Sequence, residues 1–390
     1  MFPFVYCNPT KINFGDGHVR ETGQEVAAAG MRHVLMVYGK SSIKDNGVYA
    51  AVTASLQAAG VSWVEWPGVA SNPLLSHVRG GIERARESRV DGVLAVGGGS
   101  VLDASKAIAL GVPSERDVWC YYMGEAVPER ALPLAAVLTL PATGSEMNGG
   151  TVVTHDETRE KRAVVHALLY PKVSVLDPET TLSVPARYVA YSASDAISHT
   201  IESYLTRPAA FLPVQDGYDE GVVRAIMLST ERILADPRDI EARGAMMWAA
   251  TLAWNFLGSS GVGPWSTPAH MLEHPLSGCC DVPHGAGLAV TGPAWMTWEC
   301  RRRTDRVAAF ARRIMEVQEA DDARAAAEGI ARFRSWLKKI GNPVTLGECG
   351  IGEERIPELA RHAEILARAW GTGAEYDAAT CGEILRLGLA

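Results

Sequence analysis

Two short segments of the chain carry residues that suit a divalent metal ion. Asp195 and His199 lie four residues apart in a helical pattern, so both side chains project from one helix face. His270 and His284 follow, with His274 between them. A single histidine is more often structural, but three neutral imidazoles and a carboxylate suit Fe²⁺ or Zn²⁺ with one position open for substrate. The spacing predicts a metal site without saying which histidine is left out.

A glycine-rich turn lies where the predicted strand Asp91–Val96 meets the predicted helix Val101–Leu110. Free backbone N–H groups and the positive end of the helix dipole meet at such a turn, and glycines let a pyrophosphate approach the backbone. The sequence is not the GxGxxG fingerprint of a first crossover, so it also fits a plain tight turn. For Asp103 and the serine of the turn the simpler interpretation is helix capping and dipole matching, and for Lys106 it is exposure to solvent.

A second polar turn follows the next predicted strand, with the sequence Thr139-Leu-Pro-Ala-Thr143-Gly-Ser145-Glu146. At the carboxyl end of a parallel strand, such a loop faces the crevice where ligands normally bind. Its hydroxyl groups could contact phosphates or a nicotinamide carboxamide, or they could cap a helix.

The elements that must position these residues form two blocks. Short β-rich runs alternate with amphipathic helical patterns such as Gly47–Ala59 and Leu75–Glu87 up to about Leu182–Pro185, which predicts a parallel, doubly wound sheet. Beyond that boundary the chain is predicted to be mainly helical. The predicted strands are His33–Tyr38, Ser62–Trp66, Asp91–Val96, Ala135–Leu140 and Lys172–Leu176. The predicted later helices are Val189–Leu205, Glu220–Leu234, Ile240–Leu257, Thr304–Val317 and Asp322–Lys338.

The composition narrows the class of protein. A length of 390 residues predicts two domains, which we place at residues 1–184 and 185–390. The net charge of −8 argues against nucleic acid or an anionic membrane surface as the main partner. No apolar run approaches the roughly 20 residues of a membrane-spanning helix, and the first residues do not resemble a signal peptide. Seven cysteines without a CxxC pair suit a reducing cytoplasm.

Four motifs in order resemble the iron-containing (group III) alcohol dehydrogenases, and among them the NADPH-dependent butanol dehydrogenase/aldehyde reductase branch. The similarity runs from Asn13-Phe14-Gly15 to the helical region after residue 300. The motifs are Gly97-Gly98-Gly99-Ser100-Val-Leu-Asp103-Ala-Ser-Lys106, Pro141-Ala-Thr143-Gly-Ser145-Glu146, Ser174-Val-Leu-Asp177-Pro through Asp195-Ala-Ile-Ser-His199, and His270-Met-Leu-Glu-His274-Pro-Leu through His284-Gly-Ala-Gly-Leu.

The resemblance implies a fold and a set of site residues. The fold is an α/β dinucleotide-binding domain followed by an all-α domain, as in the dehydroquinate-synthase-like enzymes, with the active site in the cleft. The implied metal ligands are Asp195, His199, His270 and His284, and His274 becomes a non-ligand proton relay. Asp103 corresponds to a polar residue near the nicotinamide. The remaining implied cofactor contacts are Gly97, Gly98, Gly99, Ser100, Thr139, Thr143, Ser145, Lys161 and Leu182.

The turn after the first predicted strand bears on the choice of cofactor. NAD-preferring relatives carry an acidic residue there for the ribose 2′-hydroxyl, whereas this chain has Gly39, and Lys40, Ser41 and Ser42 could accept a 2′-phosphate. We therefore expect NADP(H) rather than NAD. Glu65, at the end of the next strand, is the residue that could reverse this preference.

The expected reaction is hydride exchange between NADP(H) and a small alcohol/aldehyde pair, with the metal polarising the oxygen. A dehydroquinate-synthase-like lyase would need several basic residues for a sugar phosphate, whereas the segment Trp248–Pro268 is apolar. A glycerol-dehydrogenase-like enzyme would use fewer metal ligands and a more polar pocket. A binding protein without activity is the third alternative, against which the complete ligand set argues. Family analogy suggests a homodimer or larger homo-oligomer.

Overall fold

The computed structural model describes residues 1–208 and 211–390. The chain divides into two compact units. The α/β unit comprises Cys7–Val184 and Arg238–Thr251, and the helical unit comprises Met1–Tyr6, Pro185–Pro237 and Leu252–Ala390.

The α/β unit contains a six-stranded sheet in the order β1-β8-β5-β4-β2-β3. Every neighbouring pair of these strands is parallel. Parallel neighbours require crossover connections, and here helices supply most of them. The fold is the doubly wound parallel sheet that the sequence predicts. The strands are β1 Lys11–Phe14, β2 His33–Tyr38, β3 Ser62–Trp66, β4 Gly92–Gly98, β5 Leu134–Leu140 and β8 Val173–Leu176.

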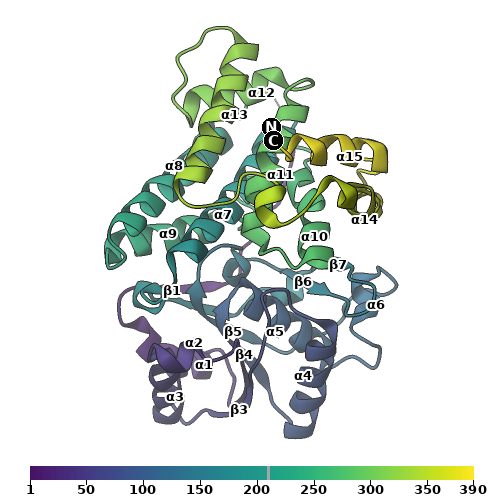
Figure 1. Cartoon of the computed structure of the whole chain (residues 1–390). Coiled ribbons are helices and arrows are strands. Elements are labelled where there is room, and N and C mark those ends of the chain that lie inside the picture. Colours follow the sequence, from purple (N-terminus) through teal and green to yellow (C-terminus); the bar gives the residue numbers. More distant parts are fainter. Residues whose placement is uncertain (209–210) are drawn as a thin grey trace. The chain divides into compact units, whose positions relative to one another are not determined.

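Both faces of this sheet are covered by helices, because alternate residues of each strand point to opposite faces. From β2, Val34 and Met36 pack with α1 (Thr22–Ala28) and α3 (Val48–Ala58). Leu35 and Val37 pack on the opposite face. There the cover consists of α4 (Leu75–Ser88) and α5 (Gly99–Gly111). Figure 1 shows α1 and α3 on one side of the strands and α4 on the other. The central strands are therefore almost uniformly apolar.

Several smaller elements complete the α/β unit. A separate antiparallel hairpin, β6 (Gly150–Thr154) with β7 (Lys161–Val165), follows the second polar turn. The helix α9 (Ile240–Ala253) groups mostly with this unit although it comes later in the chain. The short helices are α2 Ser42–Asp45, α6 Trp119–Tyr122, η1 His18–Glu21, η2 Ser145–Met147, η3 Ala167–Leu169 and η4 Pro178–Thr181.

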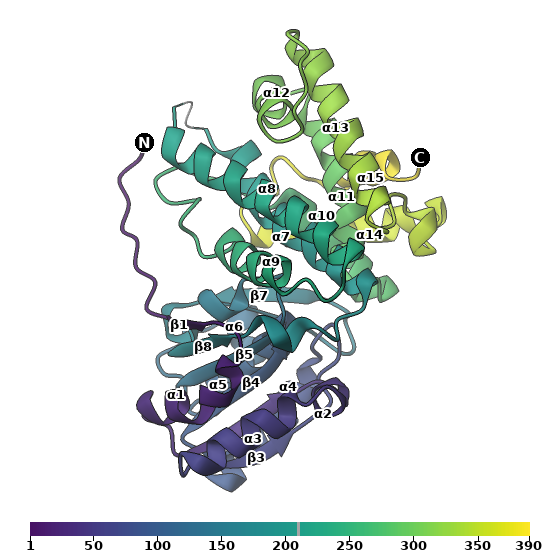
Figure 2. The ribbon, with the colours of Figure 1, turned by 90° about the vertical axis from the view of Figure 1, so that its left-hand side faces the viewer.

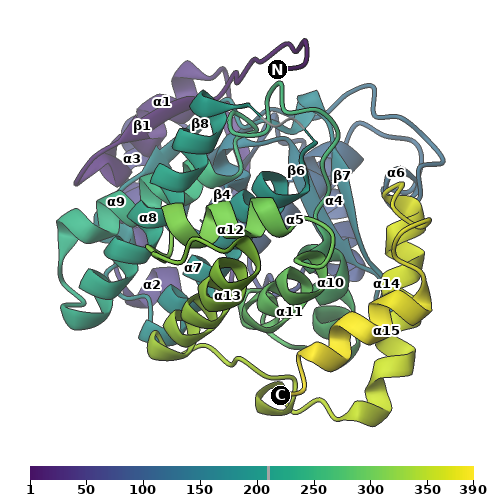
Figure 3. The same cartoon turned by 90° about the horizontal axis from the view of Figure 1, so that it is seen from above.

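The helical unit has no strand within residues 185–208 and 211–390. Figure 2 shows α7 and α8 running side by side, and Figure 3 shows the same for α14 and α15. The C-terminal region is thus helical, as predicted. The long helices are α7 Ala186–Thr206, α8 Pro213–Ala235, α10 Pro268–Cys280, α11 His284–Glu299, α12 Thr304–Arg313, α13 Asp322–Lys339, α14 Ile356–Ala369 and α15 Ala378–Leu387. Two short turns, η5 Gly347–Cys349 and η6 Glu353–Arg355, precede α14.

Two predicted helices extend too far. The helix predicted to Leu257 ends at Ala253, and the helix predicted to Val317 ends at Arg313. Phe256 and Glu316 have positive φ angles of 67° and 56°, which a right-handed helix cannot contain. In the described part of the chain, no helix is long and apolar enough to cross a membrane.

Candidate metal and cofactor sites

Three helices of the helical unit bring the predicted metal ligands together. Asp195 and His199 come from α7, His270 from α10, and His284 is the first residue of α11. The start of α11 lies directly against α7, because a Cβ on Gly285 would come within 2.0 Å of the Tyr191 carbonyl oxygen. A glycine at this position is therefore what allows the contact.

One carboxylate oxygen faces all three imidazoles. Asp195 Oδ1 lies 3.5 Å from His199 Nδ1, 3.6 Å from His270 Nε2 and 3.7 Å from His284 Nε2. Ligands at about 2.1 Å from a tetrahedral ion are separated from one another by about 3.4 Å. The three distances from Asp195 Oδ1 are close to that spacing, and the atoms of Asp195, His199 and His270 all lie within 4.8 Å of one another, as the ligands of a single ion would.

Hydrogen bonding supports the same interpretation. Within residues 1–208 and 211–390, Asp195 Oδ1, His199 Nδ1 and His270 Nε2 are buried atoms without a hydrogen-bond partner. Buried polar atoms are normally paired, so three of them turned toward one point indicate a missing positively charged partner. The donor set of nitrogen and oxygen atoms suits Fe²⁺ or Zn²⁺.

Two buried glutamates orient the histidines from behind. His270 Nδ1 is hydrogen bonded to Glu202 Oε2, and His284 Nδ1 to Glu273 Oε2. Both carboxylates are fully buried. Partners of this kind fix the tautomer and direction of a metal-binding imidazole. Neither glutamate was predicted from the sequence, although each follows a histidine, His199 or His270, by three residues on the same helix.

The surroundings also set the charge of these groups. Burial lowers the pKa of His199 to about 3, which keeps the imidazole neutral and able to bind a cation. Burial acts in the same direction on His270, but Glu202 and Asp195 outweigh it and raise the pKa of His270 to about 10. Without an ion the His270 ring therefore holds a second proton, which a metal bound at Nε2 would displace. Burial works against ionisation of Asp195, yet the neighbouring histidines hold its pKa below the ordinary value. The Asp195 carboxylate is therefore ionised across the neutral range.

His274 is placed differently from the other three histidines. Its ring centre lies 5.7 Å from that of His284 and 5.3 Å from that of Trp370. One ligand atom each from His274, Glu273 and His284 lie within 4.8 Å of one another, so His284 has His274 on one side and Asp195 on the other. His274 is thus beside the four-residue cluster without belonging to it.

Aromatic side chains border the cluster. The Trp254 ring centre lies 4.6 Å from that of His199, and Trp254 also contacts Phe256 and Trp265. Trp265 and Trp370 line a small cavity of about 140 Å³ in the same unit. Aromatic rings therefore border the cluster, and the cavity that they line also includes the hydroxyl residues Ser266, Thr267 and Thr372.

In the α/β unit, the predicted phosphate turn connects β4 directly to α5. A Cβ on Gly98 would come within 2.8 Å of Leu140 Cβ, and one on Gly99 within 2.4 Å of Thr143 Cγ2. Gly97 has a similar conflict with Val101. The glycines thus let the second polar turn pack closely against this one. No side chain caps the start of α5, which leaves its first N–H groups for a ligand.

A buried network joins the two turns. Lys106 Nζ donates to Ser145 Oγ, Asn148 O and Gly150 O, each at 2.8 Å. Ser145 Oγ in turn donates to Asp103 Oδ1 at 2.9 Å. The expectation of a solvent-exposed Lys106 is wrong: the residue is completely buried, because its ammonium group supplies donors to loop carbonyls that would otherwise be unpaired.

The Asp103 carboxyl group has a second role in this network, since its Oδ2 accepts from the Val152 backbone N–H at 3.2 Å. Burial raises the pKa of Asp103 to about 6, an effect that Lys106 and Ser145 reduce. Asp103 therefore connects α5, the second polar turn and the hairpin, in place of the simple helix capping that the sequence also allowed.

The other predicted cofactor residues belong to the same unit. Lys161 begins β7 and donates to Asn72 Oδ1 at 3.2 Å, and Ser100 Oγ donates to the Ser71 carbonyl. Thr139 lies near the end of β5, and Leu182, half-buried, follows η4. Thr143 Oγ1 accepts from the Ser145 backbone N–H at 3.2 Å.

The turn after β2 presents Lys40, Ser41 and Ser42 on the surface. A Cβ on Gly39 would meet only the Val69 carbonyl oxygen, at 3.9 Å, so packing does not require glycine there. Glu65 is already engaged: its carboxylate accepts from Tyr38 and Tyr49 and lies 3.3 Å from Lys44 Nζ.

Comparison with known proteins assigns the chain to a family. The model described as "Iron-containing alcohol dehydrogenase" matches residues 9–178, and that of the C-terminal domain of the Fe-containing alcohol dehydrogenase family matches residues 189–387. The probable NADH-dependent butanol dehydrogenase 1 of Bacillus subtilis is 38% identical over 93% of this chain and 94% of its own. The NADPH-dependent aldehyde reductase YqhD of Escherichia coli is 35% identical over 93% of both chains.

Solved structures give the same result. The crystal structure of the NADH-dependent butanol dehydrogenase A of Thermotoga maritima has a TM-score of 0.96 and 40% identity, and the match covers 100% of this chain and 99% of that one. The chain belongs to the iron-containing alcohol dehydrogenase family. It is an NAD(P)-dependent alcohol dehydrogenase with metal-dependent alcohol dehydrogenase/aldehyde reductase activity.

Proposed function

We propose that the chain interconverts small aldehydes and alcohols with NADP(H) at one divalent metal ion, Fe²⁺ or Zn²⁺. The proposed ligands are Asp195, His199, His270 and His284. The observation that carries this assignment is the convergence of three imidazole nitrogens on one buried carboxylate oxygen. When bound, the ion acts as a Lewis acid that polarises the aldehyde oxygen and stabilises the developing alkoxide.

The side chains around the ion have separate tasks in this proposal. Glu202 and Glu273 hold His270 and His284 in the tautomer that turns a lone pair toward the ion. His274 supplies the proton to the product oxygen during reduction and removes it during oxidation. The rings of Trp254, Phe256 and Trp265 favour a small apolar substrate over a charged one.

The proposed cofactor site belongs to the domain at residues 1–184, and the metal site to the domain at residues 185–390. The cofactor supplies a hydride at nicotinamide C4, and the protein supplies its orientation. The turn Gly97–Ser100 holds the pyrophosphate at the start of α5, and Asp103 orients the nicotinamide end. The remaining proposed contacts are Gly39, Lys40, Ser41, Thr139, Thr143, Ser145, Lys161 and Leu182.

NADP(H) is the proposed preference because Gly39 carries no acidic group to repel a 2′-phosphate, and Lys40 is exposed beside it. The charge of Glu65 is offset by Lys44 and its oxygens are used by two tyrosines, so it competes poorly for a ribose. The named relatives include enzymes of both kinds, which makes NAD the alternative. None of the seven cysteines forms a disulfide, which supports a cytoplasmic location, and a homodimer is the proposed assembly.

A pair of neighbouring histidine substitutions tests the metal assignment. His270→Ala should lose both the bound metal and NADPH-dependent butyraldehyde reduction. His274→Ala should keep the metal and lose rate, since it removes the proton relay alone. Metal content is measured by elemental analysis of protein purified without added metal. Full metal and full activity in His270→Ala would overturn the ligand assignment.

A further inference from the structure

We infer that the helical unit carries a second metal site, for a thiophilic divalent ion such as Zn²⁺, formed by Cys279, Glu358 and His362. One sulfur, one oxygen and one nitrogen of these residues all lie within 4.8 Å of one another. All three residues are half-buried, so an ion can enter from solvent while water is partly excluded. None of them belongs to the Asp195 cluster.

Two packed helices supply the three residues. Glu358 and His362 are four residues apart on α14, so both project from one face of that helix. Cys279 is the second-last residue of α10, which packs against α14. Asp281, with a left-handed φ of 54°, ends the helix just beyond it. The thiol is therefore held at a fixed helix end rather than on a long loop.

The chemistry of the three groups fits zinc. A thiolate, an imidazole and a carboxylate are its common protein ligands, and three of them leave a fourth position for water. The two negative charges of a Cys279 thiolate and the Glu358 carboxylate also equal the positive charge of a divalent cation. Ligands of a tetrahedral zinc ion are separated by about 3.3–3.8 Å, so rotation of half-buried side chains is enough to close the site.

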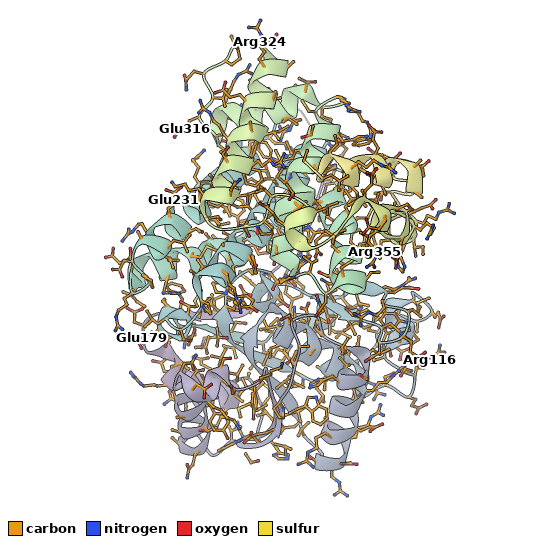
Figure 4. All side chains as sticks on the ribbon, viewed as in Figure 1. Arg116, Glu179, Glu231, Glu316, Arg324 and Arg355 are labelled. Atoms are coloured by element: carbon orange, nitrogen blue, oxygen red, sulfur yellow. The ribbon has the colours of Figure 1, made fainter. Side chains whose placement is uncertain are left out.

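Arg355 also binds the Glu358 carboxylate, which must remain able to bind the proposed ion. Its Nε donates to Glu358 Oε2 at 2.9 Å, which is a charge-assisted hydrogen bond at the start of α14. Figure 4 labels Arg355 on the ribbon of the helical unit. A carboxylate has two oxygens, and the second remains for the ion. The arginine thus positions Glu358 in the way that outer partners orient metal ligands.

The sulfur gives this site a signature that the proposed catalytic metal cannot produce. The Asp195 cluster contains only nitrogen and oxygen donors, so Co²⁺ bound there has no thiolate charge-transfer absorption. We therefore propose titration of the full-length, metal-loaded protein with Co²⁺ under a non-thiol reductant, followed in the near ultraviolet. The expected result is a thiolate-to-cobalt band that saturates with one equivalent and is abolished by one equivalent of Zn²⁺.

Variants assign the ligands. Cys279→Ser should lose the band completely, and His362→Ala should weaken Co²⁺ binding by at least about tenfold, the loss that even an outer partner of a ligand usually gives. Cys300→Ser is the matched control, because Cys300, like Cys279, is half-buried and forms no disulfide but lies at the end of α11. His270→Ala should leave the band unchanged, which separates this inference from the proposed function.

Two outcomes of the Co²⁺ titration would contradict the proposed site. No band in the wild-type protein, or a band that survives in Cys279→Ser and disappears in Cys280→Ser, would overturn the assignment. Melting temperature provides a second measurement, since an ion that binds only the folded state stabilises it. Zn²⁺ should raise the melting temperature of His270→Ala, and this increase should vanish when Cys279→Ser is added.

Discussion

Glu202 and His270 are hydrogen bonded on the side of the imidazole ring that is turned away from Asp195. Nδ1 of the ring faces the glutamate, and Nε2 lies 3.6 Å from Asp195 Oδ1. Since Glu202 also accepts the backbone N–H of His270, it fixes both the ring and the first turn of α10. The glutamate thereby determines which ring nitrogen keeps a free lone pair.

Removal of the charge on Glu202 should weaken metal binding without unfolding the protein. Glu202→Gln keeps the size of the side chain but is a poorer acceptor for the His270 ring. We expect metal affinity to fall by about 10- to 100-fold, measured by competition with a chelator. Glu83→Gln, an exposed glutamate on α4, is the control and should have no effect. Equal affinities in the two variants would contradict a role for Glu202 in orienting the ligand.

Lys106 should be essential for the stability of the α/β unit. Lys106→Met leaves four acceptor atoms, on Ser145, Asn148 and Gly150, and the carboxyl group of Asp103 without their cationic partner. Breaking one side of a buried charged pair costs about 3–5 kcal/mol. The expected result is a lower urea midpoint and weaker NADPH binding. Lys172→Met, at an exposed lysine, should change neither quantity.

Asp103 should make stability depend on pH in a defined window. Its pKa is about 6 in the folded protein, above the ordinary value of 3.8, because burial disfavours the charged form. The unfolded chain therefore loses its proton first, and the folded state loses stability as the pH rises from about 4 to about 6. Asp103→Asn lacks this change. As the pH rises from about 4 to about 6, the unfolding free energy of the wild type should fall relative to that of the variant. A difference between the two that stays constant across this range would contradict the raised pKa.

Cofactor preference should respond to one residue of the turn after β2. Gly39→Asp introduces a carboxylate where packing leaves room for it. Repulsion of the 2′-phosphate should lower kcat/KM for NADPH by more than about tenfold, which corresponds to about 1.4 kcal/mol, and leave NADH less affected. Glu65→Gln is the companion variant. A larger loss of NADH activity than of NADPH activity in Glu65→Gln would show that Glu65, and not Gly39, selects the cofactor.

The central part of the sheet could be predicted from sequence because each strand is a continuous apolar run. The inner strand β2 at His33–Tyr38 has the predicted bounds, and so does the edge strand β3 at Ser62–Trp66, although β3 is only partly buried. The edge strand β1 was not predicted, since Lys11–Phe14 is only four residues long and half-exposed, and polar and apolar residues alternate in it. The hairpin β6–β7 was missed for a related reason: each strand has only five residues, and charged residues and a glycine interrupt the apolar pattern.

The residues of the candidate metal and cofactor sites could likewise be predicted only in part from the sequence. Helical spacing was enough to propose Asp195 with His199, whereas the choice of His270 and His284 over His274 rested on the resemblance to the family and not on spacing. In the structure, the Nε2 atoms of His270 and His284 lie 3.6 and 3.7 Å from Asp195 Oδ1 because three helices pack together. The burial of Lys106 and the roles of Glu202 and Glu273 depend on tertiary contacts. Sequence spacing cannot distinguish such residues from exposed charges on a helix.

All four proposed metal ligands and both glutamates behind them belong to the helical unit, whereas every proposed cofactor contact belongs to the α/β unit. We therefore expect the metal and the nucleotide to bind independently of each other. Treatment with a chelator should yield a metal-free protein that still binds NADPH. With this form, the binding rates of the metal and of the nucleotide can be measured separately.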